Sequence, residues 1–154
     1  MDSHKEQIIT NLIKIEDALA RLYTRFSKKS NFTAPVKKFW AAIAGEEKLH
    51  SNIMDKVCQA VHEEKATVSV DLRIEKLKEF ISKLNEILKK ASSENLSEAE
   101  AYSIGAKIEV ELDEGGFTGL IHTTDEKLNK LLKLVENDTK KHRMMLVNYS
   151  RGIR

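Results

Sequence analysis

The segment VKKFWAAIAGEEKLHSNIMDKVCQAV, residues 36–61, contains an apolar helical stripe that is interrupted by two ionisable residues. Alternating steps of four and three residues fall on Val36, Trp40, Ile43, Glu47, His50, Met54, Val57 and Val61. Six of these eight positions are apolar, a pattern typical of a helix packed inside a bundle. Glu47 and His50 lie one turn apart on that face, so both would lose water on folding. Such groups need a hydrogen bond, an opposite charge or a metal ion, and the segment therefore predicts a polar site inside a helical core.

Composition places the rest of the chain in the same class. Its 154 residues predict a single domain, residues 1–154. The 26 basic and 24 acidic residues are mixed along the chain, so nucleic acid is not an expected partner. No apolar run has the length of a membrane span, so a membrane is not an expected partner either. One proline and six glycines favour helices over a turn-rich β fold. The lone Cys58 cannot form an internal disulfide, and residues 1–10 show no signal-peptide pattern, so a cytoplasmic location is expected.

Five segments have the periodicity of amphipathic helices. We expect helices at about Ser3–Lys29, from a cap at Thr33 to about Glu64, at Asp71–Lys90, at Glu98–Ile121, and from a cap at Thr124 to about Tyr149. The four longer ones predict an all-α, up-down four-helix bundle, with the helix at residues 71–90 as an additional helix in the crossover connection.

Local signals refine these boundaries. Ser97 followed by Glu100 is a capping box. Gly115 and Gly116 are expected to weaken or kink the helix that contains them. The β-branched stretch at residues 67–70 is too short and isolated to predict a sheet, and we interpret it as an extended connection.

The chain repeats the pairing of a core carboxylate with a core histidine. In the first half a glutamate precedes Glu-x-x-His by 31 residues, and in the second half a glutamate precedes Thr-x-x-His by 30 residues. Placed face to face, the two halves would bring together Glu16, Glu47, His50, Glu109 and His142. Three carboxylates in one core require a cation or protons to compensate their charge.

The quoted segments also resemble a known family. FWAAIAGEEKLHSNIM (residues 39–54) and IEDALARLYTRFSKK (residues 15–29) resemble the second and first helices of the rubrerythrin-like branch of the ferritin-like superfamily. This resemblance implies a ferritin-like fold and a di-iron centre, with manganese or zinc as other metals. The ligands it implies are Glu16, Glu47, His50, Glu109 and His142, with Glu111 as a rival for the place of Glu109.

The chain departs from the family pattern in two ways. Thr139 stands where the family has a carboxylate, and a hydroxyl is a poor ligand for iron, so the second metal position is expected to be weaker. Asp138 or water could fill that gap. Rubredoxin-type cysteines are absent, so a redox reaction would need an external electron donor.

Three functions follow, in decreasing order of expectation. The first is a metal-binding carboxylate bundle protein in peroxide, oxygen or iron handling, with peroxidase-like oxidoreductase activity left open. The second is a helical scaffold or interaction protein with a degenerate metal site, favoured by Thr139. The third is iron storage in a ferritin-like shell. Metal ions are the expected partners, and a homodimer is left open.

Overall fold

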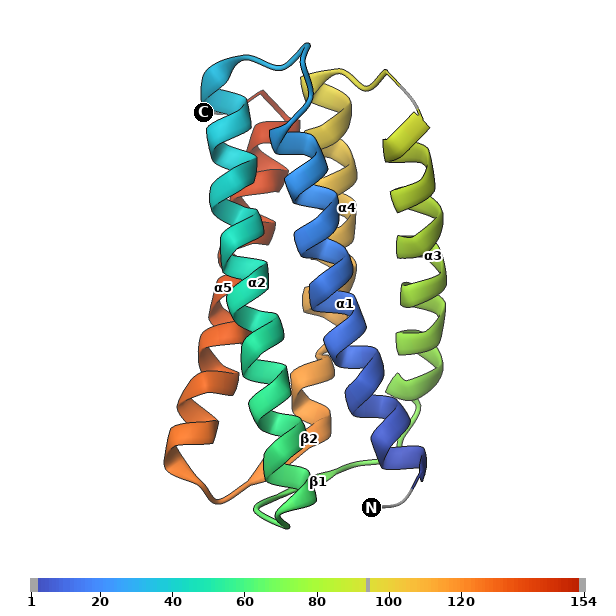
Figure 1. Cartoon of the computed structure of the whole chain (residues 1–154), viewed down its shortest axis with the longest axis vertical. Helices are drawn as coiled ribbons and strands as arrows, with labels where there is room; N and C mark the ends of the chain where they lie inside the picture. The colour runs from blue at the N-terminus through green and yellow to red at the C-terminus, as the bar shows by residue number, and fades with distance from the viewer. Residues whose placement is uncertain (1–2, 94, 153–154) are drawn as a thin grey trace.

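The computed structural model describes residues 3–93 and 95–152, and within them the chain is almost entirely helical (Figure 1). Its elements are α1 (Ser3–Ser27), α2 (Ala34–His62), β1 (Ala66–Val68), α3 (Arg73–Ser93), α4 (Glu98–Gly115), the 3₁₀ helix η1 (Phe117–Leu120), β2 (Ile121–Thr123) and α5 (Glu126–Ser150). The predicted all-helical class is confirmed. Apart from α4, the helices begin and end within a few residues of the predicted boundaries.

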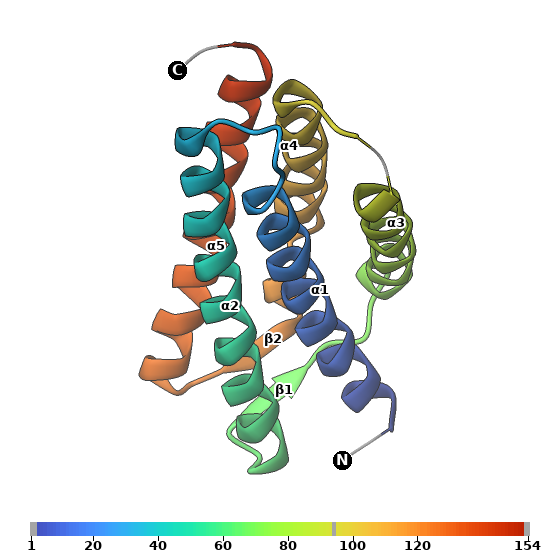
Figure 2. The ribbon, with the colours of Figure 1, turned by 45° about the horizontal axis from the view of Figure 1, so that its top comes forward.

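The long helices lie side by side with their apolar faces turned inward. α1 packs along α2, α4 packs along α5, and α3 lies against α1 at the edge of the molecule (Figures 1 and 2). Every apolar position of the stripe in residues 36–61 is buried. Trp40 is fully buried, and its ring centroid lies 4.8 Å from that of Phe26. A Cβ atom at Gly105 would lie 2.8 Å from the Trp40 ring, so this glycine allows α4 to approach α2 closely.

Local signals set most helix ends. Ser97 and Glu100 form the predicted capping box at the start of α4. At the start of α5 the cap is Asp125, whose carboxylate accepts a backbone N–H of the first turn, and the prediction of Thr124 was wrong by one residue. Thr33 is the N-cap of α2 by position, but its side chain makes no capping hydrogen bond.

The predicted helix at residues 98–121 is too long. α4 ends at Gly115, and Gly116 has a left-handed backbone with φ 57°. Glycine adopts this conformation without steric cost and commonly ends helices, so the two glycines end the helix and do not kink it. The chain then continues through η1 into β2.

The connection after α2 also differs from the prediction. Ala66–Val68 forms strand β1 and pairs antiparallel with β2, with Thr67 opposite His122. The partner strand lies more than fifty residues away in sequence, so local pattern could not reveal it. Within the described residues this sheet has two strands and ties the α2–α3 connection to the α4–α5 connection.

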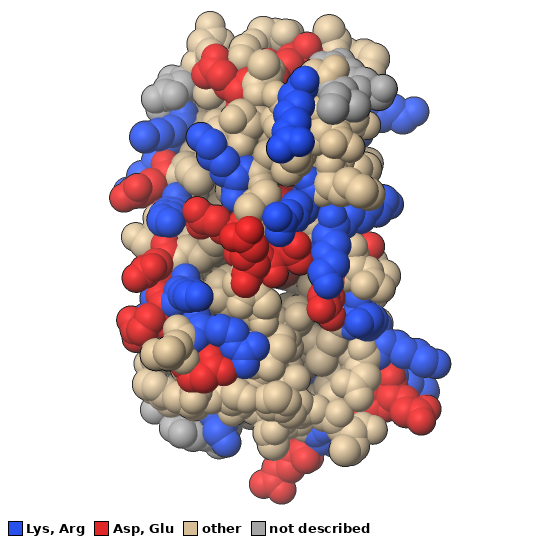
Figure 3. All heavy atoms as spheres, turned by 180° about the vertical axis from the view of Figure 1, so that it is seen from behind, with Lys and Arg blue, Asp and Glu red and all other residues tan. Residues whose placement is uncertain are grey.

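The surface is charged and mixed. Figure 3 shows lysines and arginines interspersed with acidic side chains over one face, with the acidic ones gathered near its middle. Among the described helices none is both long and apolar enough to cross a membrane.

Candidate metal centre

The five predicted side chains come from four different helices and meet in the core. Glu16 projects from α1, Glu47 and His50 from α2, Glu109 from α4 and His142 from α5. Glu16 is 6% exposed, and the other four are at most 1% exposed. Each side chain lies on the buried face of its helix because its apolar stripe neighbours turn that face inward.

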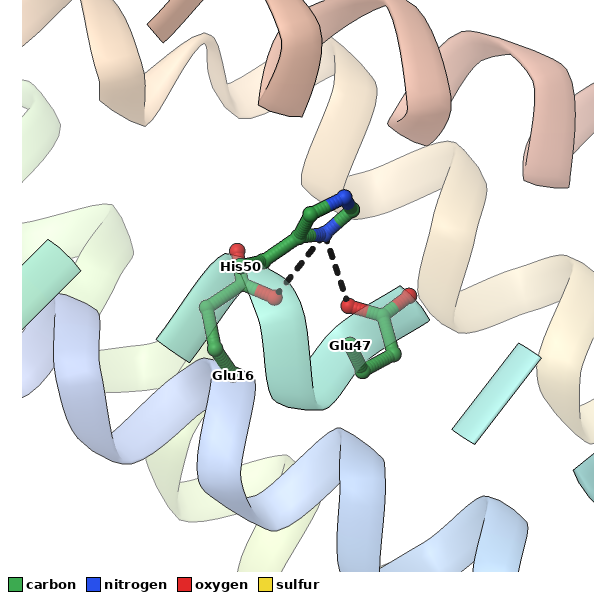
Figure 4. A group of neighbouring side chains, drawn as sticks. All are labelled: Glu16, Glu47 and His50. Carbon is green, nitrogen blue, oxygen red and sulfur yellow. Dashed lines mark hydrogen bonds and ion pairs between the residues drawn. The ribbon is translucent and has the colours of Figure 1, made fainter. Parts of the chain in front are cut away.

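Three of these side chains form a first cluster (Figure 4). His50 Nδ1 lies 3.2 Å from Glu47 Oε2 and 3.6 Å from Glu16 Oε2. In Figure 4 the ring nitrogen of His50 points to the two carboxylates, one from its own helix and one from α1. One ligand atom from each residue can be chosen so that all three lie within 4.8 Å of one another, a spacing that suits a single metal ion.

A second cluster shares Glu47 with the first. His142 Nδ1 lies 2.9 Å from Glu47 Oε1 and 3.8 Å from Glu109 Oε1. The imidazole rings of His50 and His142 are stacked with centroids 6.0 Å apart. The two oxygens of Glu47 therefore face two different histidines, and Glu47 joins the clusters.

The choice between Glu109 and Glu111 is decided by helix rotation. Glu109 is fully buried and accepts a hydrogen bond of 2.7 Å from the hydroxyl of Tyr23. Glu111 is exposed, and its Oε1 lies 3.5 Å from Lys83 Nζ at the surface. Glu109 is therefore the α4 carboxylate of the cluster.

Two further carboxylates bind the outer nitrogens of the histidines. His50 Nε2 donates to Asp138 Oδ2 over 2.9 Å, and His142 Nε2 donates to Glu46. Sequence reasoning gave Glu46 no role and considered Asp138 only as a substitute ligand. A signal in the repeat could have identified them, because they occupy equivalent positions in the two halves. Glu46 directly precedes Glu47, and Asp138 directly precedes Thr139. Such outer carboxylates hold an imidazole in one orientation and keep its other nitrogen free for a metal.

Several atoms at the centre of the site lack a hydrogen-bond partner. Among the described residues, five buried side-chain polar atoms are unpartnered, and four of them belong to the clusters: Glu16 Oε2, Glu47 Oε1, Glu109 Oε2 and His142 Nδ1. Glu47 Oε1 and His142 Nδ1 are 2.9 Å apart, but their angle is unsuitable for a hydrogen bond. Buried polar atoms are normally satisfied, so a group of unpartnered donor atoms aimed at a common volume fits a metal ion.

The electrostatics of the metal-free site lead to the same inference. Burial, and then the charge of Glu47, raise the pKa of Glu16 well above its usual value and that of Glu109 to about 8. Burial would also raise the pKa of Glu47, but the close approach of His142 and His50 outweighs it and lowers that pKa. Burial lowers the pKa of each histidine, yet the neighbouring carboxylates raise it to about 11 for His50 and about 9 for His142. In the metal-free protein, bound protons therefore compensate the negative charge that a bound cation would compensate.

Thr139 lies beside the clusters but does not contribute a ligand atom to them. Its side chain is buried, and its hydroxyl donates to the backbone carbonyl of Val135 over 2.9 Å. Together with Glu16 it lines a cavity of about 80 Å³. The position that would carry a fourth carboxylate therefore adjoins open space.

Comparison of the chain with protein-family models, with curated proteins and with solved structures gives no match. The geometry by itself supports a helical protein in which two groups of buried carboxylates and histidines, among the described residues, could hold a metal ion.

Proposed function

We propose that this protein binds two divalent metal ions side by side in its core. The observation that carries the proposal is the position of Glu47, whose Oε2 lies 3.2 Å from His50 Nδ1 and whose Oε1 lies 2.9 Å from His142 Nδ1. A carboxylate whose two oxygens face two imidazoles can bridge two ions, as carboxylates do in helical-bundle metal centres. The unpartnered atoms of the neighbouring side chains supply the remaining donors.

The donors divide into two sets that share one residue. Glu16, Glu47 and His50 would hold one ion, and Glu109 and His142 would hold the other together with Glu47. When bound, a pair of iron ions would supply the electrons for reducing oxygen or peroxide. Mixed carboxylate and imidazole donors suit iron and manganese, and they accept zinc as well.

Other side chains of the chain orient these donors. Asp138 and Glu46 accept from the outer nitrogens of the two histidines, which leaves each Nδ1 directed into the site. Tyr23 donates to one oxygen of Glu109 and leaves its other oxygen unpartnered. The donors are at most 6% exposed, so little of their own surface contacts bulk water.

We propose further that the fold is a ferritin-like four-helix bundle of α1, α2, α4 and α5, with α3 in the crossover between the halves. The function would then resemble that of rubrerythrin-like proteins, in peroxide, oxygen or iron handling. The order of the carboxylate and histidine helices along the chain supports this. Cys58 is the single cysteine, so electrons would come from an external donor. We also propose a cytoplasmic location, and a homodimer would be compatible with this function.

A second candidate function is a helical scaffold with a degenerate metal site. It is favoured by Thr139, whose hydroxyl is directed to the carbonyl of Val135 on its own helix. In that case the contacts of His50 with Glu47 and Asp138 would be structural, and the chain would act through its surface.

Metal analysis of protein purified without chelators tests the two candidates. The metal proposal expects about two equivalents of iron or manganese per chain and a lower melting temperature after EDTA treatment. Glu47→Gln should lose the metal, whereas Glu111→Gln, an exposed change on α4, should keep it. Absence of metal, together with a melting temperature that neither iron nor EDTA changes, would favour the scaffold.

A further inference from the structure

The cavity beside Thr139 adjoins the candidate metal centre. Its volume of about 80 Å³ has room for a small organic molecule of a few non-hydrogen atoms. Most of its wall is apolar, formed by Leu12, Ile15, Met54, Leu112, Phe117 and Val135. The apolar part of the wall gives ordered water few partners, and the polar part includes Glu16 and Thr139, so a small molecule with a hydrocarbon chain and a polar end suits the space.

The lining of the cavity includes a residue of the centre with an unpartnered carboxylate oxygen. Glu16 lines it, is 6% exposed, and its Oε2 makes no hydrogen bond to any described residue. Thr139 lines the same cavity, and its hydroxyl is already used by Val135. A ligand in the cavity would therefore reach the site at the position that lacks a carboxylate.

The charge of the site indicates which kind of ligand fits. On the proposed function, two dications carry four positive charges, and Glu16, Glu47 and Glu109 supply three negative ones. Asp138 and Glu46 pair with the outer nitrogens of the histidines and are 20% and 37% exposed, so this count covers the metal ligands alone. One more negative charge at the Thr139 position would make the total charge of the metal ligands equal and opposite to that of the two dications.

Two other acidic residues that line the cavity are paired with basic side chains. Asp113 and Glu136 line it, but Arg143 donates to Asp113 over 2.9 Å and Lys140 Nζ lies 3.5 Å from Glu136. Basic and acidic side chains thus pair around the opening.

We propose that the cavity binds a short-chain monocarboxylate, whose carboxylate binds the metal pair in place of the side chain missing at Thr139. Its hydrocarbon chain would lie against the apolar wall between α1 and α4. This inference rests on the proposed metal function and adds a ligand class to it.

The test uses full-length protein loaded with Co²⁺, whose absorption bands report its coordination. Butanoate is titrated, with calorimetry and the Co²⁺ spectrum as readouts. We expect one butanoate per chain and a changed spectrum. Butanamide has the same shape but no charge. It should bind at least about tenfold more weakly, because it loses one charge-assisted contact. Leu112→Phe, which fills the cavity from a half-buried position, should weaken butanoate similarly and leave Co²⁺ binding unchanged.

Substitutions at Thr139 provide the sharpest comparison. Thr139→Glu supplies the missing carboxylate and should abolish butanoate binding while Co²⁺ is retained, whereas Thr139→Val should bind butanoate as the wild type does. Equal butanoate affinity of Thr139→Glu and wild type would overturn the proposal, and so would equal binding by metal-free protein. Tight Co²⁺ binding with a spectrum that butanoate leaves unchanged refutes this inference alone. Failure to bind Co²⁺ refutes the metal function as well.

Discussion

His50 on α2 and Asp138 on α5 lie 2.9 Å apart, from Nε2 to Oδ2, although 88 residues separate them in the chain. The reciprocal pair is His142 with Glu46. It joins the same two helices, but here the histidine is on α5 and the carboxylate is on α2. The outer carboxylate of each half thus orients the histidine of the other half. Neither histidine is held by its own half alone, so docking of α5 on α2 is a condition for the site.

Asp138→Ala should weaken metal binding at the Glu16–Glu47–His50 cluster. Removing the outer carboxylate frees the His50 ring to rotate, and loss of such a partner costs about 10–100-fold in metal affinity. Titration of metal-free protein with Mn²⁺ would measure the change. Glu111→Gln is the matched control, because its partner, Lys83, lies at the surface. Unchanged affinity in Asp138→Ala would contradict the orienting role.

Glu47→Gln and Glu16→Gln should differ in how many ions they lose. Glu47 has an oxygen in each cluster, so its neutral isostere should lose both equivalents. Glu16 belongs to one cluster, so Glu16→Gln should retain about one equivalent, with the other weakened at least about tenfold. Stoichiometry from Co²⁺ titration distinguishes the two, with circular dichroism to check folding. If both variants lose the same number of ions, Glu47 does not bridge.

Thr139→Glu should tighten the weaker of the two metal equivalents. Each cluster has one carboxylate and one histidine of its own and shares Glu47, and α5 offers no carboxylate to the site because Thr139 stands there. An added carboxylate brings charge and a bond to a dication, worth about tenfold or more in affinity. Comparison of Mn²⁺ isotherms before and after the substitution tests this. Two equal affinities in the wild type would show that the asymmetry does not exist.

The stability of the metal-free protein should fall as the pH rises from about 7 to about 10. The pKa of Glu109 is raised from 4.5 to about 8 and that of His142 from 6.5 to about 9. A raised pKa stabilises the fold fully below the unfolded value, and this contribution is lost as pH rises through the folded value. We expect these two groups to contribute a loss on the order of 4 kcal/mol, measured by urea unfolding in EDTA.

Saturating Mn²⁺ should reduce this pH dependence, because bound metal displaces the same protons. Metal affinity should therefore increase over the interval in which metal-free stability falls. A metal-free stability that rises toward pH 10 would contradict these protonation states.

Gly116→Ala and Gly45→Ala should change stability in opposite directions. Neither added Cβ would meet an atom within 4 Å, so both substitutions isolate backbone effects. Gly116 has φ +57°, where alanine is strained, and a loss of about 1–2 kcal/mol is expected. Gly45 is an exposed position within α2, where alanine should add about 0.5–1 kcal/mol. Chemical denaturation measures both, and a neutral Gly116→Ala would show that the left-handed turn is not required.

The sequence by itself determined which segments become helices and which faces they bury. The stripe from Val36 to Val61 follows the helical period, and period and capping depend only on neighbouring residues, so Ser97 and Glu100 were recognised correctly. The same reasoning located Glu47 and His50 inside the core, because their position on the stripe is independent of what packs against it.

Only the tertiary structure decided the relations between distant segments. The pairing of β1 with β2, the choice of Glu109 over Glu111, the contact of His50 with Asp138 and the cavity beside Thr139 depend on how each helix is rotated and how deeply it docks. Those quantities are set by the packing of side chains from all helices at once, which no local period encodes.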